Sequence, residues 1–300
     1  MIVTVTLNPA LDLTYTVDAL VPHATHRVAA VAERPGGNGL NVAGVLHTLG
    51  EPVLATGLLG GATGRRVTEL LAAVGVPASF VPIAGETRRT VAVTDRHDAT
   101  GFWEPGPPVT AQEWEGFLDH VRELLAAADV LTLSGSLPPG VPQDGYATLI
   151  RLARDAGVPV VLDASGEALR HGLAAGPDLA KPNAAELATL APDARPADVL
   201  AHGARSVVVS RGPEGLLALA GDDAWQAAPP EPVSGNPTGA GDACVAALAR
   251  GLRDATPWPG LLADAVALSA AAVSAPVAGT VDAAAYHRLR PAVTVTALQG

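Results

Sequence analysis

Short strand-like runs alternate regularly with helix-like segments through the second half of the chain, and this alternation constrains the fold more than any other feature. The strand-like runs are rich in valine and leucine and lie at 130–133, 158–163, 179–182 and 206–210. A helix-like segment follows each of the first three, and a further strand-like run at 216–219 pairs back from the fourth. Strands that alternate with helices in this way form mainly parallel sheets covered by helices on both faces. The pattern therefore predicts an α/β fold with a mainly parallel central sheet.

A second group of strand-like runs lies in the first third of the chain and is surrounded by polar residues, at 13–17, 27–32, 91–94 and 101–103. Their surroundings are too polar for a core, so we expect a small sheet that stands off the main body, formed by segments near 12–34 and 88–104. No repeat, low-complexity tract or long linker divides the chain. We therefore expect residues 1–300 to form one domain.

Composition excludes several classes of function. The formal net charge of −11 disfavours binding to nucleic acid or to an anionic membrane. The single cysteine, Cys244, excludes an internal disulfide framework and a cysteine-based zinc site, and its position in a helix-like run favours a packing role. The N-terminus begins directly with a strand-like run, and the Ala-rich stretch after residue 260 is interrupted by Asp264 and indicates a buried helix. We expect a cytoplasmic protein.

The chemistry of the chain centres on a Gly-x-Gly turn at residues 237–243, which opens a helix-like run. Unpaired N–H groups at a helix start and the helix dipole favour an anion there. Asp242 in the first turn could take a proton from an attacking hydroxyl while the amides stabilise a transferring phosphoryl group. An ordinary acidic residue at a helix start explains this turn equally well.

Further polar groups lie where strands are expected to end, and carboxyl ends of parallel strands share one edge of a sheet. A second Gly-rich turn at residues 36–43 is either another anion-binding turn or a tight connection. Arg88 and Arg89 begin a strand and are either solvated surface residues or anion clamps. The edge of the sheet is therefore the expected binding site, with groups at Ser134–Ser136, Asp163, Asn183, Ser210–Gly212 and Gly239–Asp242.

Taken together, these motifs resemble the PfkB carbohydrate-kinase family, which has the ribokinase-like fold. The similarity covers nearly the whole chain and is greatest to the branch that contains 1-phosphofructokinase and tagatose-6-phosphate kinase. It rests on a series of motifs in order: Thr6–Asp12, Gly36–Ala43, Thr87-Arg88, Glu104–Pro107, Ser134–Gly140, Asp163–Leu169, Lys181–Leu187 and the Gly-Ala-Gly-Asp turn. The resemblance implies a kinase that uses ATP and Mg²⁺, and it favours the catalytic interpretation of Asp242.

The resemblance also implies roles for individual residues. Asp242 matches the catalytic base, and the amides of Gly239, Ala240 and Gly241 match the anion hole. The expected nucleotide-binding residues are Asn183, Ser210, Gly212, Gly215 and Thr238. Glu186 pairs with Asn183 and is expected to organise Mg²⁺ through water. The expected sugar-binding residues are Asp12, Arg27, Gly37, Asn38, Asn41, Arg88 and Ser136. The small sheet matches the family's lid, which closes over the sugar and often forms a homodimer contact.

Two positions depart from the sugar-phosphate branch. Asn38 stands where that branch usually has lysine, and Thr90 stands where it usually has asparagine. The first change removes a cation that could bind a substrate phosphate, although Arg27 and Arg88 remain and Arg89 is an additional candidate. The expected reaction is phosphorylation of fructose 1-phosphate at O6. The alternatives are a kinase for tagatose 6-phosphate or for a non-phosphorylated sugar, and a non-catalytic sugar-phosphate sensor.

Overall fold

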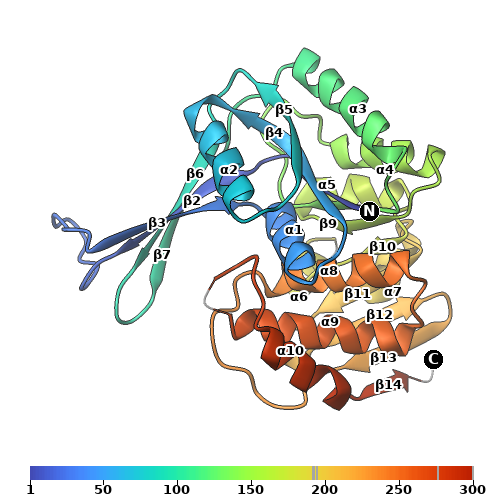
Figure 1. The fold of residues 1–300 in the computed structure, drawn as a ribbon. Coiled ribbons are helices and arrows are strands. Elements are labelled where there is room, and N and C mark those ends of the chain that lie inside the picture. Colours follow the sequence, from blue (N-terminus) through green and yellow to red (C-terminus); the bar gives the residue numbers. More distant parts are fainter. Residues whose placement is uncertain (191–192, 194, 276, 299–300) are drawn as a thin grey trace.

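Two β-sheets organise the chain in the computed structural model (Figure 1), which describes residues 1–190, 193, 195–275 and 277–298. The large sheet has ten strands, and its central strands are parallel, whereas β12, β13 and β14 pair antiparallel at one end. Along the sheet the order is β14 (Val295–Leu298), β13 (Asp223–Ala227), β12 (Leu216–Ala220), β11 (Ser206–Ser210), β10 (Leu179–Ala180), β9 (Val160–Asp163), β8 (Val130–Ser134), β1 (Ile2–Thr6), β4 (Val53–Gly60) and β5 (Ala78–Ile83).

Helices cover both faces of the large sheet, as the alternation predicted. One hydrophobic cluster packs α1 (Asn38–Thr48), α2 (Gly61–Ala73), α8 (Ala240–Arg253), α9 (Trp258–Val273) and α10 (Ala283–Leu289) against it. A second cluster on the other face involves α3 (Ala111–Leu125), α4 (Gly145–Asp155), α5 (Gly166–Ala174), α6 (Ala184–Leu190) and α7 (Pro196–Ala201). Two short 3₁₀ helices, η1 (Gly212–Glu214) and η2 (Arg290–Ala292), complete the elements.

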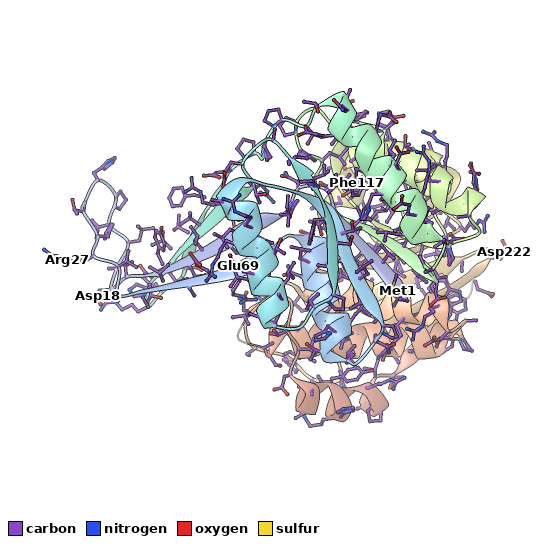
Figure 2. The ribbon with its side chains drawn as sticks, turned by 45° about the horizontal axis from the view of Figure 1, so that its top comes forward. Met1, Asp18, Arg27, Glu69, Phe117 and Asp222 are labelled. Carbon is purple, nitrogen blue, oxygen red and sulfur yellow. The ribbon has the colours of Figure 1, made fainter. Side chains whose placement is uncertain are left out.

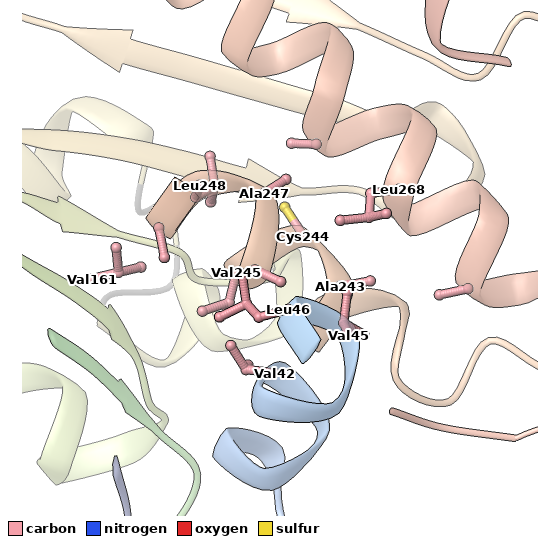
Figure 3. Packing of buried hydrophobic residues seen from close by; sticks show 14 of the residues in the cluster. Val42, Val45, Leu46, Val161, Ala243, Cys244, Val245, Ala247, Leu248 and Leu268 are labelled. Carbon is pink, nitrogen blue, oxygen red and sulfur yellow. The ribbon is translucent and has the colours of Figure 1, made fainter. Parts of the chain in front are cut away.

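Side-chain alternation along the strands explains the two clusters. In β1, Ile2 joins the first cluster while Val3 and Val5 join the second, because successive side chains of a strand point to opposite faces. Within the first cluster, α8 contributes mainly alanines, which pack against α1 and α9, and Figure 3 shows Cys244 among the neighbouring side chains. Because these side chains are small, α8 packs closely against α1 and α9. This close packing fixes the position of the start of α8. Thr110 forms the predicted capping box with Glu113 at the start of α3.

The small sheet contains four strands in the order β3 (Ala30–Gly36), β2 (Ala10–Thr16), β6 (Arg88–Thr94) and β7 (Ala99–Trp103). It projects from one side of the main body (Figure 1), as the sequence predicted. The expected strand at 27–32 was placed too early. In β3 the pairing with β2 runs from Ala30 opposite Thr16 to Gly36 opposite Ala10, so the strand continues through Pro35 into the Gly-rich turn. An edge strand tolerates this proline because the outer N–H positions need no partner.

The predicted buried helix after residue 260 corresponds to α9, which contains ten buried residues including Asp264. Among the helices of the described residues, none combines the length and the apolar character that a membrane span requires.

Candidate active site

A cleft of about 640 Å³ lies between the small sheet and the carboxyl ends of the parallel strands. Its volume is typical of a small-molecule site. Most of the predicted site residues line it: Asp12, Gly37, Asn38, Asn41, Arg88, Asn183, Glu186, Ser210, Gly212, Thr238, Gly239, Gly241 and Asp242. Thr90, Trp103, Asp163 and Lys181 also line it. The structure therefore brings segments from the whole length of the chain to the predicted edge.

The start of α8 forms one wall of this cleft. Gly239 precedes the helix in the left-handed backbone conformation, with φ of 88°, which residues other than glycine rarely adopt. The N–H of Ala240 donates to the carbonyl of Pro237 at 3.1 Å, so this predicted anion-hole amide has a partner. Among the described residues, no backbone carbonyl accepts from the N–H groups of Gly241 and Asp242. These two amides are therefore the ones that can receive an anion.

Asp242 is almost completely buried, at 6% exposure, and accepts a hydrogen bond from Asn41 Nδ2 on α1 at 2.8 Å. Burial and the nearby Asp163 carboxylate raise the pKa of Asp242 to about 7, although Asn41 and Lys181 oppose that shift. A carboxylate with a pKa near neutrality is a far stronger base than an exposed aspartate, and it can take a proton at physiological pH.

The small sheet contributes Asp12 to the opposite side of the cleft. Asp12 lies on β2 next to Gly36 of β3, where any Cβ atom would meet the Asp12 carboxylate at 2.0 Å, so the glycine makes room for this acid. Thr90, one of the two departures from the sugar-phosphate branch, donates its hydroxyl to Asp12 Oδ1. Burial raises the pKa of Asp12, and the Thr90 hydrogen bond and the charges of Arg34 and Arg88 counteract this.

Strand alternation separates the two neighbouring arginines. Arg88 lines the cleft, where its guanidinium donates to the carbonyls of Asn8 and Glu104, each at 3.1 Å. Arg89 instead forms an ion pair with the Glu104 carboxylate at 3.0 Å and lies more than half exposed. Arg88 is therefore the one of the two that lines the cleft and is the candidate anion clamp, whereas Arg89 lies at the surface.

Two of the predicted sugar-binding residues lie outside the cleft. Arg27 is exposed at the far tip of the small sheet (Figure 2) and does not line the cleft. Ser136 follows β8 and accepts a hydrogen bond from Asn8 Nδ2 at 3.1 Å, so it helps to hold the loop after β1. The sequence could not show that these two residues lie outside the cleft, because both are on loops whose direction depends on tertiary packing.

The predicted nucleotide-binding residues follow β10 and β11. Asn183 and Glu186 cap α6 reciprocally: each side chain accepts from the other's backbone N–H at 2.8 Å. Both also line the cleft, and burial raises the pKa of Glu186. Ser210 and Asn183 form an isolated parallel β-bridge, and Gly212 lines the cleft. Gly215 does not line the cleft and lies against the backbone of Ala227.

The metal-binding capacity of these residues is limited. Across the described ranges, no group of three or more His, Cys, Asp or Glu side chains is arranged to hold a metal ion. Glu186 and Asn183 supply oxygen atoms, which Mg²⁺ prefers, and Mg²⁺ is often held by one or two carboxylates together with substrate phosphates. The donor set therefore fits a magnesium ion that arrives with a nucleotide.

Cys244 is a buried free thiol behind Asp242, and burial raises its pKa to about 11. It is therefore a packing residue, as expected. The sequence placed Asp163 at the binding edge without a specific role and gave Lys181 none, and the two side chains form a buried ion pair in the cleft at 2.9 Å. Both occur within motifs that carried the family resemblance, and that was the available signal.

The family model described as pfkB family carbohydrate kinase matches residues 5–284. The chain belongs to the PfkB family of carbohydrate kinases. It is therefore an enzyme, an ATP-dependent sugar kinase, rather than a non-catalytic sensor.

Solved structures support the same assignment. Phosphofructokinase-2 from Escherichia coli is 31–32% identical, covering 97% of this chain and 98% of that one, with TM-scores of 0.89–0.90 for its complexes with potassium and with fructose 6-phosphate. A tetrameric inhibited form of that enzyme has a TM-score of 0.88. A possible 1-phosphofructokinase from Thermotoga maritima is 28% identical over 100% of both chains, with a TM-score of 0.89. This PfkB kinase thus shares its complete fold with phosphofructokinases.

Proposed function

We propose that this PfkB kinase is a 1-phosphofructokinase, which transfers a phosphoryl group from ATP to O6 of fructose 1-phosphate. The observation that carries the proposal is the position of Arg88, which lies in the same cleft as the buried Asp242. A guanidinium clamps an anionic phosphate well because it presents several donors in a fixed plane. A substrate phosphate at Arg88 would leave the opposite end of the sugar free to approach Asp242.

The reaction follows from this arrangement as a direct in-line transfer. Asp242 accepts the proton of the attacking hydroxyl while the hydroxyl oxygen forms a bond to the γ-phosphorus. The bond from that phosphorus to the bridging oxygen of ATP breaks, and ADP leaves with the electron pair. The Gly241 and Asp242 amides would stabilise the charge on the transferring phosphoryl group. Asp12, Asn38 and Asn41 would hold the sugar hydroxyls, because carboxylates accept and amides both donate and accept.

The nucleotide is expected on the β10–β11 side of the cleft. Asn183, Ser210, Gly212 and Thr238 would contact its phosphates and ribose, and Gly215 would shape the loop behind them. Mg²⁺ would neutralise charge on the ATP phosphates, with Glu186 holding it through water. Burial raises the pKa of Glu186, and a bound cation would counteract that shift by favouring the ionised carboxylate.

A different acceptor is the second candidate. Asn38 lines the cleft and lacks the positive charge that a lysine would bring there. In addition, the chain is 31% identical to phosphofructokinase-2 from Escherichia coli, whose structure contains bound fructose 6-phosphate. Fructose 6-phosphate, tagatose 6-phosphate and neutral sugars therefore belong in the same assay. A preference for neutral sugars would contradict the role proposed for Arg88.

The Arg88→Ala variant tests which acceptor the cleft selects. We expect kcat/KM for fructose 1-phosphate to fall by roughly 10- to 100-fold, since a charge-assisted hydrogen bond contributes about 1.5–3 kcal/mol. Turnover of unphosphorylated fructose, measured in the same coupled assay, should change little. Arg89→Ala is the matched control, because Arg89 pairs with Glu104 away from the cleft, and its kcat/KM should stay near wild type. Equal losses for both sugars or for both variants would contradict the proposal.

We also propose that two copies of the chain associate through the small sheet. Large apolar side chains are exposed there, including Val31 at 59% and Phe102 at 58%. Phe102→Asp should convert a dimer to a monomer in sedimentation velocity, whereas Val74→Asp, on an equally exposed residue after α2, should not. A wild-type monomer would refute this interface.

Arg27 could bind a substrate only in a partner's cleft, because it lies at the tip of its own small sheet.

A further inference from the structure

Arg34 lies on β3 of the small sheet and reaches the main body of the protein. It is paired with Asp12 on β2, and directly paired residues carry their side chains on the same face of a sheet. The half-buried guanidinium donates from Nη2 to the carbonyl of Ala278. Among the described residues, this carbonyl is the one hydrogen-bond acceptor of the guanidinium, and Arg34 does not line the cleft. Its role therefore differs from that of Arg88.

The loop at residues 277–281, which accepts this hydrogen bond, packs against the start of α8. An ideal Cβ built on Gly239 would lie 3.0 Å from Ala278 Cα, which is shorter than an ordinary van der Waals contact. The loop therefore lies about as close to Gly239 as a glycine permits. Because the Gly239 turn carries the unpaired amides of Gly241 and Asp242, a shift of Ala278 would change the space in which those amides lie.

The same loop also packs against α1. An ideal Cβ on Gly279 would lie 3.0 Å from Asn41 Oδ1, and one on Gly44 would lie 2.6 Å from the carbonyl oxygen of Gly279. Asn41 in turn donates from Nδ2 to the Asp242 carboxylate at 2.8 Å. The loop at 277–281 therefore supports the amide side chain that holds this carboxylate.

Further hydrogen bonds hold the loop together. The Thr280 hydroxyl donates to the carbonyl of Val277 at 2.6 Å, and the N–H of Asp282 donates to the carbonyl of Ala271 on α9 at 3.1 Å. A loop that is closed on itself and fixed to a helix moves as a unit. A displacement of the Arg34 attachment would therefore reach both the Gly239 turn and the side chain of Asn41.

We infer that Arg34 is a positioning residue for phosphoryl transfer, which couples the sugar-binding side of the small sheet to the turn that carries Asp242. The inference rests on the proposed function, since it takes the sugar to bind at Asp12 and the proton to pass to Asp242. The permanently charged guanidinium attracts the Asp12 carboxylate while it holds the Ala278 carbonyl. A sugar that binds at Asp12 thereby fixes β3 and, through Arg34, the loop behind Asp242.

Arg34→Met tests this coupling in the ADP-release assay. We expect kcat to fall by roughly 10- to 100-fold, because a small displacement of reacting groups has an effect of that size. The loss should be equal for fructose 1-phosphate and for unphosphorylated fructose, since Arg34 acts on the Asp242 turn rather than on a substrate phosphate. Arg34→Lys, which keeps the charge and a donor, should recover part of the lost kcat. A loss confined to fructose 1-phosphate would make Arg34 a phosphate-binding residue and overturn the inference.

Arg66→Met is the matched control. Arg66 on α2 donates from Nε to Glu33 of β3 at 2.8 Å, so it also ties this strand to the main body, one residue before Arg34. Its ion-pair partners in the described part of the chain are Glu33 and Glu69, neither of which belongs to the loop at 277–281. The kcat of Arg66→Met should stay near wild type. Equal losses in the two variants would show a general need to attach the small sheet and would contradict the inference.

Hydrogen exchange measures the coupling without turnover. In the free protein, peptides that cover residues 237–243 and 277–281 should exchange faster in Arg34→Met than in Arg66→Met, whereas peptides from α3 should exchange equally. Unchanged exchange in the first two segments would overturn the inference alone, and uniformly faster exchange that includes α3 would reduce Arg34 to a general stabilising residue. Failure of the wild-type enzyme to turn over fructose 1-phosphate would instead overturn the proposed function.

Discussion

Asp242→Asn is expected to lower kcat by about 10²- to 10⁴-fold, because the variant keeps the shape of the side chain but cannot accept the proton of the attacking hydroxyl. The KM for ATP should change little, since no nucleotide contact is assigned to this side chain. The coupled ADP-release assay measures both quantities. Thermal stability should not fall, because burial already disfavours the charged form of Asp242 and raises its pKa to about 7.

The matched control for this variant lies at the other end of the same helix. Asp254→Asn removes an exposed carboxylate that pairs with Arg253 at 2.7 Å, and its kcat should remain near wild type. In the wild-type enzyme the rate should fall as pH decreases through about 7, because protonation inactivates Asp242, and this acidic limb should be absent from residual Asp242→Asn activity. An Asp242→Asn variant that keeps a tenth or more of wild-type kcat would exclude the catalytic-base assignment.

Gly241→Ala is expected to give a folded but inactive kinase. The added methyl group would meet Lys181 Nζ at 3.6 Å, an ordinary contact, so the free energy of unfolding should change by less than about 1 kcal/mol. The same methyl group would occupy the space beside the unpaired amides where the phosphoryl group is proposed to bind. We expect kcat to fall by about 100-fold or more, as for the loss of an oxyanion-hole donor.

A second glycine provides the contrast for this experiment. Gly116 lies within α3, where an added Cβ would meet nothing within 4 Å, so Gly116→Ala should raise stability by up to about 1 kcal/mol and leave kcat unchanged. Denaturant unfolding and the ADP-release assay on both variants separate the two effects. Full activity of Gly241→Ala would mean that the phosphoryl group binds elsewhere.

Much of the fold could be predicted from the sequence because local patterns and tertiary packing agree there. The strand–helix alternation after residue 130, the capping box at Thr110 and the small sheet are all confirmed. The strand β5 was not anticipated, since Pro82 interrupts its apolar run. The sheet tolerates this proline because β5 lies at its edge. Among the described residues, the short strand β14 pairs only with β13, a contact that no local sequence pattern specifies.

The candidate site was predictable at the ends of parallel strands and less so on the small sheet. The turns carrying Asp242 and Asn183 were placed correctly in the cleft because topology alone brings strand ends together. Arg88 and Arg89 could not be told apart until the register of β6 fixed which one faces the cleft. Arg27 was expected near the sugar, but the length of the loop between β2 and β3 carries it to the tip of the sheet.

The most direct test of the central claim is the rate of ADP release from Mg·ATP with and without fructose 1-phosphate, with the product identified by ³¹P NMR. We predict that ADP and fructose 1,6-bisphosphate form in a one-to-one ratio, and that fructose 6-phosphate, tagatose 6-phosphate and fructose are poorer acceptors. ADP release that responds only to neutral sugars, or to no sugar at all, would contradict the assignment as a 1-phosphofructokinase.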